Sequence, residues 1–358
     1  MDYQRTKAGT IYTELQVGDN KLRLIARDIK KRGSNLSAIV GVYWNDNQLE
    51  YSVINPDDMR ARAGLAMAAW AVIPNEYKGV EPFGHRPEIL KAELALFCEN
   101  LWDAHVGRIQ VESQPFRTDI QPPQFVGPYV LEEGGTLLFG LPGAGKSWFT
   151  YALAATINSG DRQVWDRVHQ RRVLFVNLER GPLQFESKMN SIYRSLGLDN
   201  AQFPMDRINA RGKTLQDVKD RVLKHIDTHG NDVLFLDSLS RAGAGSMVKD
   251  DVANEVMDTL SAMCPTWLAI AHEKHQEVGI DGEPKRGGEH TFGSQMFRGA
   301  ADLEVHLESR QTPGRLALTL TPKKSNVLID WNSDTVYLDM DERGVKAISR
   351  PWHDARRV

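Results

Sequence analysis

The sequence has little of what marks secreted, membrane-spanning or disordered proteins. It holds two cysteines, Cys98 and Cys264, which cannot build a disulfide framework and which fit a reducing compartment. Its first residues contain no apolar signal core, and its longest apolar run, residues 63–73, is too short to span a bilayer. We therefore expect a cytoplasmic protein with no membrane partner.

An excess of either charge sign is also missing. Lys and Arg total 44 against 47 for Asp and Glu, which gives a formal net charge of −3. This balance excludes a uniformly basic coat for nucleic acid, although a locally basic groove remains compatible with it. Hydrophobic residues make up 41% and charged residues 25%, which excludes collagen-like and wholly disordered chains. A chain of 358 residues is long enough for about two domains of ~150 residues each.

The sequence predicts a small N-terminal α+β domain over residues 1–112. Asn45 to Asn47 separates two of its β-rich runs and is a hairpin turn signal. The predicted strands are 10–17, 22–29, 38–44 and 49–54, and the predicted helices that follow are 57–72 and 87–106. Residues 113–128 hold four prolines and are predicted to be an extended linker.

Residues 129–340 are predicted to form a second, α/β domain. Short runs that are almost wholly apolar alternate with helical segments, which is typical of parallel strands buried on both faces. These runs are 136–139, 173–178, 233–237 and 267–272. Strand follows strand after Asp302, at 303–308, 315–321, 327–329 and 335–338, which indicates antiparallel strands added to the parallel sheet. Residues 341–358 are predicted to be a basic C-terminal tail.

One motif in this domain carries specific chemistry. Residues 140–147 match the pattern G-x-x-x-x-G-K-[ST] in full, after a predicted strand and before a predicted helix. Glycines let consecutive backbone N–H groups wrap a phosphate, and the following helix presents its positive end to the same anion. Lys146 is expected to reach the β- and γ-phosphates of ATP, and the Ser147 hydroxyl to ligate Mg²⁺. The predicted nucleotide-binding residues are Gly140, Leu141, Pro142, Gly143, Ala144, Gly145, Lys146, Ser147 and Trp148.

Two carboxylates are expected to complete the reaction site. Asp237 ends the apolar run 233–237, where an acidic group can hold the Mg²⁺. In AAA+-type ATPases a glutamate usually follows this aspartate and activates water, but the next residue here is Ser238. Glu179, at the end of the run 173–178, is the predicted general base instead.

In these features the sequence resembles the RecA-like core ATPases, and most closely the RepA-type hexameric helicases, which are related to the DnaB-type replicative helicases. The resemblance covers residues 134–326 and rests on six segments in order. These are 140–147, Asn177–Arg180, the strand-end Asp237, the strand-end His272, Arg298–Asp302 and Lys323–Asn326. It implies a RecA-like P-loop fold, in which His272 reads the γ-phosphate. A purely structural role for His272 stays open.

The resemblance also implies a cation that reaches into a neighbouring subunit's nucleotide, here called the trans finger. Lys323 and Lys324 are the first candidates, because the family's strand pair projects a cation at this place. The family's usual Lys and Arg two residues apart are not present, so Arg298 is a rival candidate. The alternative is that Lys323 and Lys324 are solvent-exposed lysines with no role in a nucleotide site. A trans finger requires a homo-oligomer, most simply a hexamer.

Two loops are expected to contact single-stranded DNA, again by resemblance. The longer one, 277–295, carries Lys285 and Arg286 among glycines, and the shorter one runs from Arg241 to Lys249. Basic groups on flexible backbone suit phosphate contacts. An ordinary mobile surface loop is the alternative for each.

The sequence therefore predicts an ATP-hydrolysing motor on single-stranded DNA, most simply a replicative helicase. A RecA-like ATPase that assembles on DNA without unwinding it, in recombination or helicase loading, is the second hypothesis. A nucleotide-gated scaffold whose N-terminal domain binds a protein partner is the third.

Overall fold

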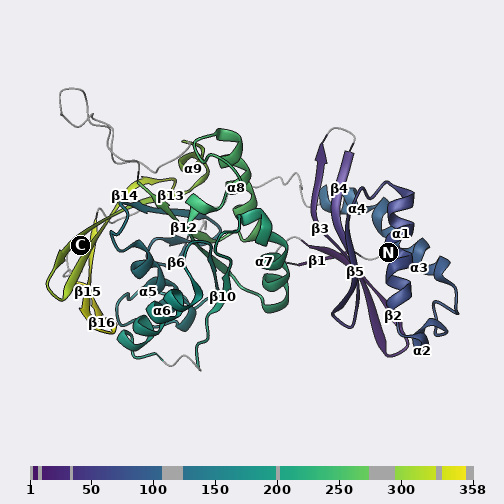
Figure 1. The fold of residues 1–358 in the computed structure, drawn as a ribbon, viewed down its shortest axis with the longest axis horizontal. Helices are drawn as coiled ribbons and strands as arrows, with labels where there is room; N and C mark the ends of the chain where they lie inside the picture. The colour runs from purple at the N-terminus through teal and green to yellow at the C-terminus, as the bar shows by residue number, and fades with distance from the viewer. Residues whose placement is uncertain are drawn as a thin grey trace, which may run out of the picture. The chain divides into compact units, whose positions relative to one another are not determined.

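The structure is a computed structural model, and it describes residues 3–6, 10–32, 35–106, 124–198, 202–273, 295–327 and 333–351. The chain forms two compact units, Met1–Asp119 and Ile120–Val358 (Figure 1). The linker predicted over 113–128 crosses this boundary. Its residues up to 123 lie outside the described residues, whereas Phe125–Gly127 forms strand β6 of the second unit, with Val126 buried in that unit's core.

The first unit is an antiparallel sheet whose strands follow one another in space as they do in sequence. Asn45 and Asp46 connect β4 to β5 with positive φ angles of 46° and 68°, a conformation that Asn and Asp tolerate well. This confirms the predicted hairpin. The strands are β1 (Gln4–Arg5), β2 (Ile11–Val17), β3 (Asn20–Arg32), β4 (Asn35–Trp44) and β5 (Asn47–Ile54).

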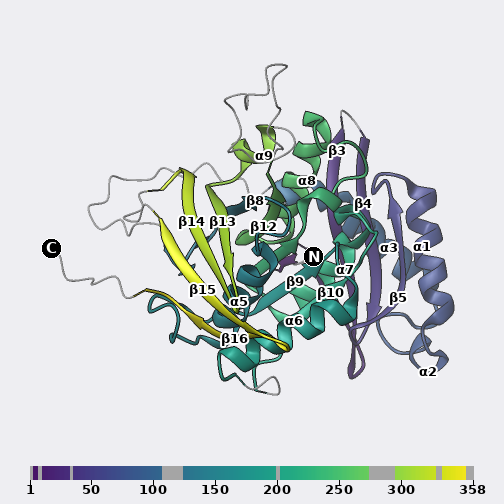
Figure 2. The same ribbon diagram turned by 60° about the vertical axis from the view of Figure 1, so that its left-hand side comes forward.

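Four helices follow the sheet of the first unit in sequence, and the first and third lie along one of its faces (Figure 2). Asp58 caps the first helix by accepting hydrogen bonds from the backbone N–H groups of Arg60 and Ala61. Pro87 occupies the first turn of the third, where its missing N–H costs nothing. The helices are α1 (Met59–Val72), α2 (Asn75–Lys78), α3 (Pro87–Glu99) and α4 (Leu101–Val106).

The second unit is built on a nine-stranded sheet with the order β10-β9-β11-β12-β8-β13-β14-β15-β16. The first six strands in this order are parallel to one another, and the last three are antiparallel. This confirms an α/β fold with antiparallel strands added at one edge, except that the predicted strand 303–308, which is part of β13, runs parallel to β8. The strands are β8 (Gly135–Gly140), β9 (Val173–Asn177), β10 (Asp206–Asn209), β11 (Val233–Asp237), β12 (Trp267–His272), β13 (Leu303–Thr312), β14 (Arg315–Ser325), β15 (Asp334–Asp341) and β16 (Gly344–Ser349). A small hairpin of β6 and β7 (Val130–Leu131) precedes them.

The direction of each crossover decides which face its helix covers. The chain moves one way along the sheet through α5 and α6 and the other way through α7 and α8, so right-handed crossovers place these pairs on opposite faces. Figure 1 shows this arrangement. Every residue of β8, β9 and β11 is buried, as expected for strands covered on both faces. The helices are α5 (Lys146–Ser159), α6 (Pro182–Ser195), α7 (Leu215–His229), α8 (Asp250–Met263) and α9 (Gln295–Ala300), with a short 3₁₀ turn η1 (Leu239–Arg241).

The prediction that residues 341–358 form a tail is wrong for their first part. Gly344–Ser349 forms the edge strand β16, in which Val345 is fully buried and Lys346 is exposed. Sequence analysis missed this strand because Lys346 within it, and Arg343 and Arg350 on either side, made the segment look like a basic tail, whereas an exposed lysine is common on an edge strand. The strand predicted at 327–329 falls largely outside the described residues.

Candidate nucleotide-binding site

The phosphate loop joins β8 to α5, as the motif predicts. Gly143 and Gly145 have φ angles of 80° and 93°, which residues with a side chain rarely adopt. At Gly140 an added Cβ would lie 2.2 Å from the backbone oxygen of Leu307. The glycines are therefore required by the geometry, which leaves the backbone N–H groups of the loop open to an anion at the N-terminus of α5.

Lys146 is the first residue of α5 and is buried. Its Nζ donates hydrogen bonds to the carbonyl oxygens of Gly140 (2.7 Å) and Leu141 (2.8 Å), which hold the ammonium group against the loop. Burial lowers the pKa of Lys146 to about 8, and the carboxylates of Asp237 and Glu179 partly oppose this shift. The loop thus holds a desolvated cation that gains from an anionic ligand.

Ser147 and Asp237 meet beside the loop, as predicted from sequence. The Ser147 Oγ donates a hydrogen bond to Asp237 Oδ2 at 3.0 Å, and both residues are buried. Burial raises the pKa of Asp237, and the nearby Glu179 raises it further. A hydroxyl and a carboxylate oxygen at this distance are hard oxygen ligands of the kind that Mg²⁺ prefers, so the pair fits the predicted metal.

Glu179 follows β9, the strand that pairs with β11 and its Asp237. The Ser238 hydroxyl donates to Glu179 Oε2 at 2.7 Å. Asn177, which is fully buried, fixes the turn that carries Glu179 because its Oδ1 accepts from the backbone N–H groups of Glu179 and Arg180. The carboxylate is therefore aimed by two side chains that the sequence analysis did not assign.

His272 lies at the same end of the sheet, with Nε2 4.0 Å from Glu179 Oε2. Burial lowers its pKa, and Lys146 lowers it further, so the ring is neutral at pH 7. The next residue, Glu273, donates its backbone N–H to Gly140 O and pairs through its carboxylate with His306 at 3.1 Å. The strand end is thus tied directly to the phosphate loop.

Two cations at this site were not predicted. Arg180 lies next to Glu179, and its charge affects the pKa values of Asp237, Lys146 and His272. Lys188, on α6, places its Nζ 4.8 Å from the ring centroid of Trp148. Arg180 could have been found as the neighbour of the predicted base. Lys188 had no sequence signal, because the packing of α6 on α5 brings it to the site.

The candidates for the trans finger have partners within their own chain. Arg298 Nε forms an ion pair with the fully buried Glu304 at 2.8 Å. Lys324 Nζ donates to the carbonyl oxygens of Arg298 (2.7 Å) and Ala301 (2.6 Å) at the end of α9. Lys323 precedes it on β14. Lys324 therefore acts as a cap for α9 in this structure.

The predicted DNA-contacting residues are described only in part. Arg241 ends η1 and is close enough to His272 to lower its pKa. Lys249 precedes α8 and is its N-cap residue. Lys285 and Arg286 lie outside the described residues.

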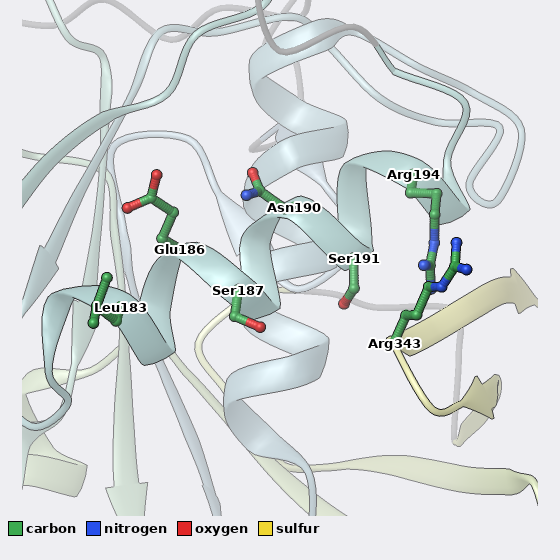
Figure 3. A pocket seen from close by; sticks show the side chains of 7 residues that line it. All are labelled: Leu183, Glu186, Ser187, Asn190, Ser191, Arg194 and Arg343. Atoms are coloured by element: carbon green, nitrogen blue, oxygen red, sulfur yellow. The ribbon is translucent and has the colours of Figure 1, made fainter.

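A separate pocket of about 520 Å³ runs along the outer face of α6 (Figure 3). Arg194 at one end donates to Asp341 Oδ1 and to the backbone oxygen of Val345. The pocket is lined by Leu183, Glu186, Ser187, Asn190, Ser191, Arg194 and Arg343. It contains none of the predicted site residues, so it is distinct from the phosphate loop.

The α/β sheet, the phosphate loop and the buried Ser147–Asp237 pair define a P-loop NTPase domain. The model of a protein family described as AAA domain matches residues 108–277. This match includes the loop, Glu179, Asp237 and His272, and it supports a P-loop ATPase domain in this segment. A search of curated proteins found no match to the chain. Among the helices that the structure describes, none is long and apolar enough to cross a membrane.

Proposed function

We propose that the protein is a RecA-like, homo-oligomeric ATPase that moves along single-stranded DNA, and most specifically a RepA-type replicative helicase. The observation that carries this proposal is the position of the base. Glu179 follows the strand beside Asp237, whereas the residue after Asp237 is a serine whose hydroxyl binds Glu179. This arrangement supports the RecA-like branch over ATPases whose base directly follows the aspartate.

The residues have separate roles in the proposed hydrolysis. Glu179 accepts a proton from the water that attacks the γ-phosphorus, while the bond to the β-phosphate oxygen breaks and ADP leaves. Lys146 and the loop N–H groups hold the phosphates, and Ser147 and Asp237 would hold Mg²⁺. A Mg²⁺ ion held there would supply positive charge to the phosphates during the reaction.

The proposed link to DNA runs through His272. Its ring lies near Glu179, and Glu273 after it is bonded to the phosphate loop. The chain then enters the predicted DNA loop of residues 277–295. Arg241, in the other predicted loop, acts on the same histidine. A change at the γ-phosphate would therefore reach both loops through one side chain.

ATP turnover and strand displacement together test the proposal. Wild-type turnover should rise when a single-stranded DNA oligonucleotide is added, and the enzyme should unwind a forked duplex in the presence of ATP. Lys146→Ala should abolish both activities, because the phosphates lose their main cation. Replacing Lys285 and Arg286 by alanine should weaken DNA binding and lower the salt slope by roughly one unit per lost phosphate contact.

The possible results separate the three hypotheses. Stimulation by DNA without unwinding would favour an assembly ATPase over a helicase. An ATP turnover rate that does not change when DNA is added would contradict the hypothesis of a DNA motor. It would favour the nucleotide-gated scaffold, with the first unit as the site for a protein partner.

A further inference from the structure

The backbone of Arg180 is fixed as firmly as that of the proposed base. Its N–H donates to Asn177 Oδ1 at 2.9 Å, and its carbonyl oxygen accepts from Asn177 Nδ2 at 2.9 Å. Gly181 and Pro182 follow, and α6 begins at Pro182. One buried amide therefore holds Arg180 in place from both sides.

Among the residues that the structure describes, no partner of the Arg180 side chain explains this placement. Its Nε is buried, and within the described part of the chain its guanidinium forms no hydrogen bond or ion pair. Arg171 and Arg194, by comparison, pair with Glu132 and Asp341. A buried guanidinium N–H without an acceptor is costly unless a ligand supplies one.

Lys188 approaches the same place from the next helix. Its Nζ lies over the ring of Trp148, the residue that directly follows the metal-binding hydroxyl of Ser147. Like Arg180, it forms no ion pair within the residues that the structure describes. Its contact with Trp148 sets the direction of the ammonium group while leaving its N–H donors available.

The charges around the phosphate loop are consequently unequal. Lys146, Arg180, Lys188 and Arg241 supply four positive charges, and Asp237, Glu179 and Glu273 supply three negative ones. The site therefore has an excess of positive charge before any neighbouring subunit contributes, and a phosphate ester would use it.

We propose that Arg180 is a catalytic residue that contacts the γ-phosphate in cis, with Lys188 as a second cation on the phosphate chain. This inference rests on the proposed ATPase function. The planar guanidinium can donate two parallel hydrogen bonds to phosphate oxygens, and it stabilises the charge that develops as the γ-phosphoryl group leaves ADP for water. Each subunit would then supply this cation to its own nucleotide.

The first test compares Arg180→Gln with Arg171→Gln, a control whose arginine pairs with Glu132 away from the loop. Arg180→Gln should lower kcat by about 10³-fold and change KM little, because the contact forms mainly in the transition state. Arg171→Gln should match the wild type. Lys188→Met should mainly raise KM. Circular dichroism melting confirms that each variant is folded, and Arg180→Lys, which keeps the charge, should retain more activity than Arg180→Gln.

The second test asks which subunit supplies the cation. Arg180→Gln protein mixed with Lys146→Ala protein should stay inactive if Arg180 acts in cis, because no site in the mixture then holds both side chains. Recovery of activity on mixing would place Arg180 in a neighbour's site and overturn the inference. The same mixture made with Arg298→Ala tests the rival trans finger independently.

The outcomes distinguish this inference from the proposed function. A wild type that hydrolyses ATP, together with an Arg180→Gln variant of equal kcat, overturns the role of Arg180 alone. A wild type that neither binds nor hydrolyses ATP contradicts the ATPase itself, and the inference falls with it.

Discussion

Two carboxylates lie side by side at the ends of β9 and β11, and each receives a hydrogen bond from a different serine. Ser147 donates to Asp237, and Ser238 donates to Glu179. Asp237 is buried, with a raised pKa, whereas about a quarter of the Glu179 side chain is exposed to solvent. This asymmetry supports the proposed roles, with metal binding by the buried group and proton transfer by the accessible one.

Substituting the two carboxylates should therefore give different defects. Glu179→Gln should bind ATP as the wild type does and lose about 10²–10⁴-fold in turnover, because the amide keeps the shape but cannot accept a proton. Asp237→Asn should instead raise the Mg²⁺ concentration needed for half-maximal activity. Fluorescent-nucleotide binding and Mg²⁺ titrations of turnover measure the two effects. Normal turnover in Glu179→Gln would assign the base to another residue.

His272 should make the stability of the protein sensitive to acid. Its folded-state pKa lies below the ordinary value of 6.5, so below pH 6.5 the unfolded chain takes up a proton that the folded chain does not. Stability should fall as the pH drops from 6.5 toward the folded pKa, by at most about 1.4 kcal/mol per pH unit for this one group.

Urea denaturation of the wild type and of His272→Gln, measured between pH 7 and pH 5, isolates this contribution. The variant should lose less stability over this range, because it lacks the imidazole whose pKa differs between the folded and unfolded states. The Glu273–His306 pair is present in both proteins, so its contribution cancels in the comparison. An identical pH dependence in the two proteins would contradict the lowered pKa.

At the scale of elements, Lys324 joins β14 to the end of α9. Lys324→Met should lower the free energy of unfolding by about 1–3 kcal/mol, because it removes a charged donor from carbonyl oxygens at the end of a helix, where the helix itself supplies no donors. Lys346→Met, on the exposed face of β16, is the matched control and should have little effect. Denaturant melts measure both, and equal stability of the two variants would argue against the cap.

The elements that the sequence predicted best are the strands whose side chains are buried on both faces of the sheet. The apolar runs that became β8, β9, β11 and β12 are buried on both faces, so composition alone marked them. β10 was missed because three of its four residues are charged or polar, and because it lies at the edge of the sheet, where no continuous apolar run is needed. β16 was missed for a similar reason.

In the candidate site, too, residues marked by a local sequence pattern were predicted, whereas residues brought in by tertiary packing were not. Lys146, Ser147, Glu179 and Asp237 were predicted because each sits at a fixed place in a local motif or at a strand end. Lys188 reaches the site only through the packing of two helices, and Lys324 was assigned to a finger because its contacts with α9 are set by tertiary structure. Local patterns do not encode such contacts.

At the scale of the whole molecule, the two units have separate hydrophobic cores. Every described residue of the nucleotide site belongs to the second unit. A protein consisting of residues 120–358 should therefore fold and hydrolyse ATP at a rate within about threefold of the full chain, since no catalytic group is removed. Turnover and thermal melting of the two proteins check this. Loss of turnover in a folded 120–358 protein would assign the first unit a part in catalysis.

The amide of Asn177 has a further consequence for the control of the reaction. Besides holding the turn of Glu179, its Nδ2 donates to Asn209 Oδ1 at 3.0 Å, and Asn209 ends β10, the strand at the edge of the sheet. An edge strand is where another chain can add its own hydrogen bonds. One side chain thus connects this edge strand to the turn of Glu179, the proposed base, so a molecule that shifts β10 on docking would change the rate of the proposed hydrolysis. Where docking changes the affinity for nucleotide, nucleotide binding changes the affinity for that molecule by the same coupling free energy.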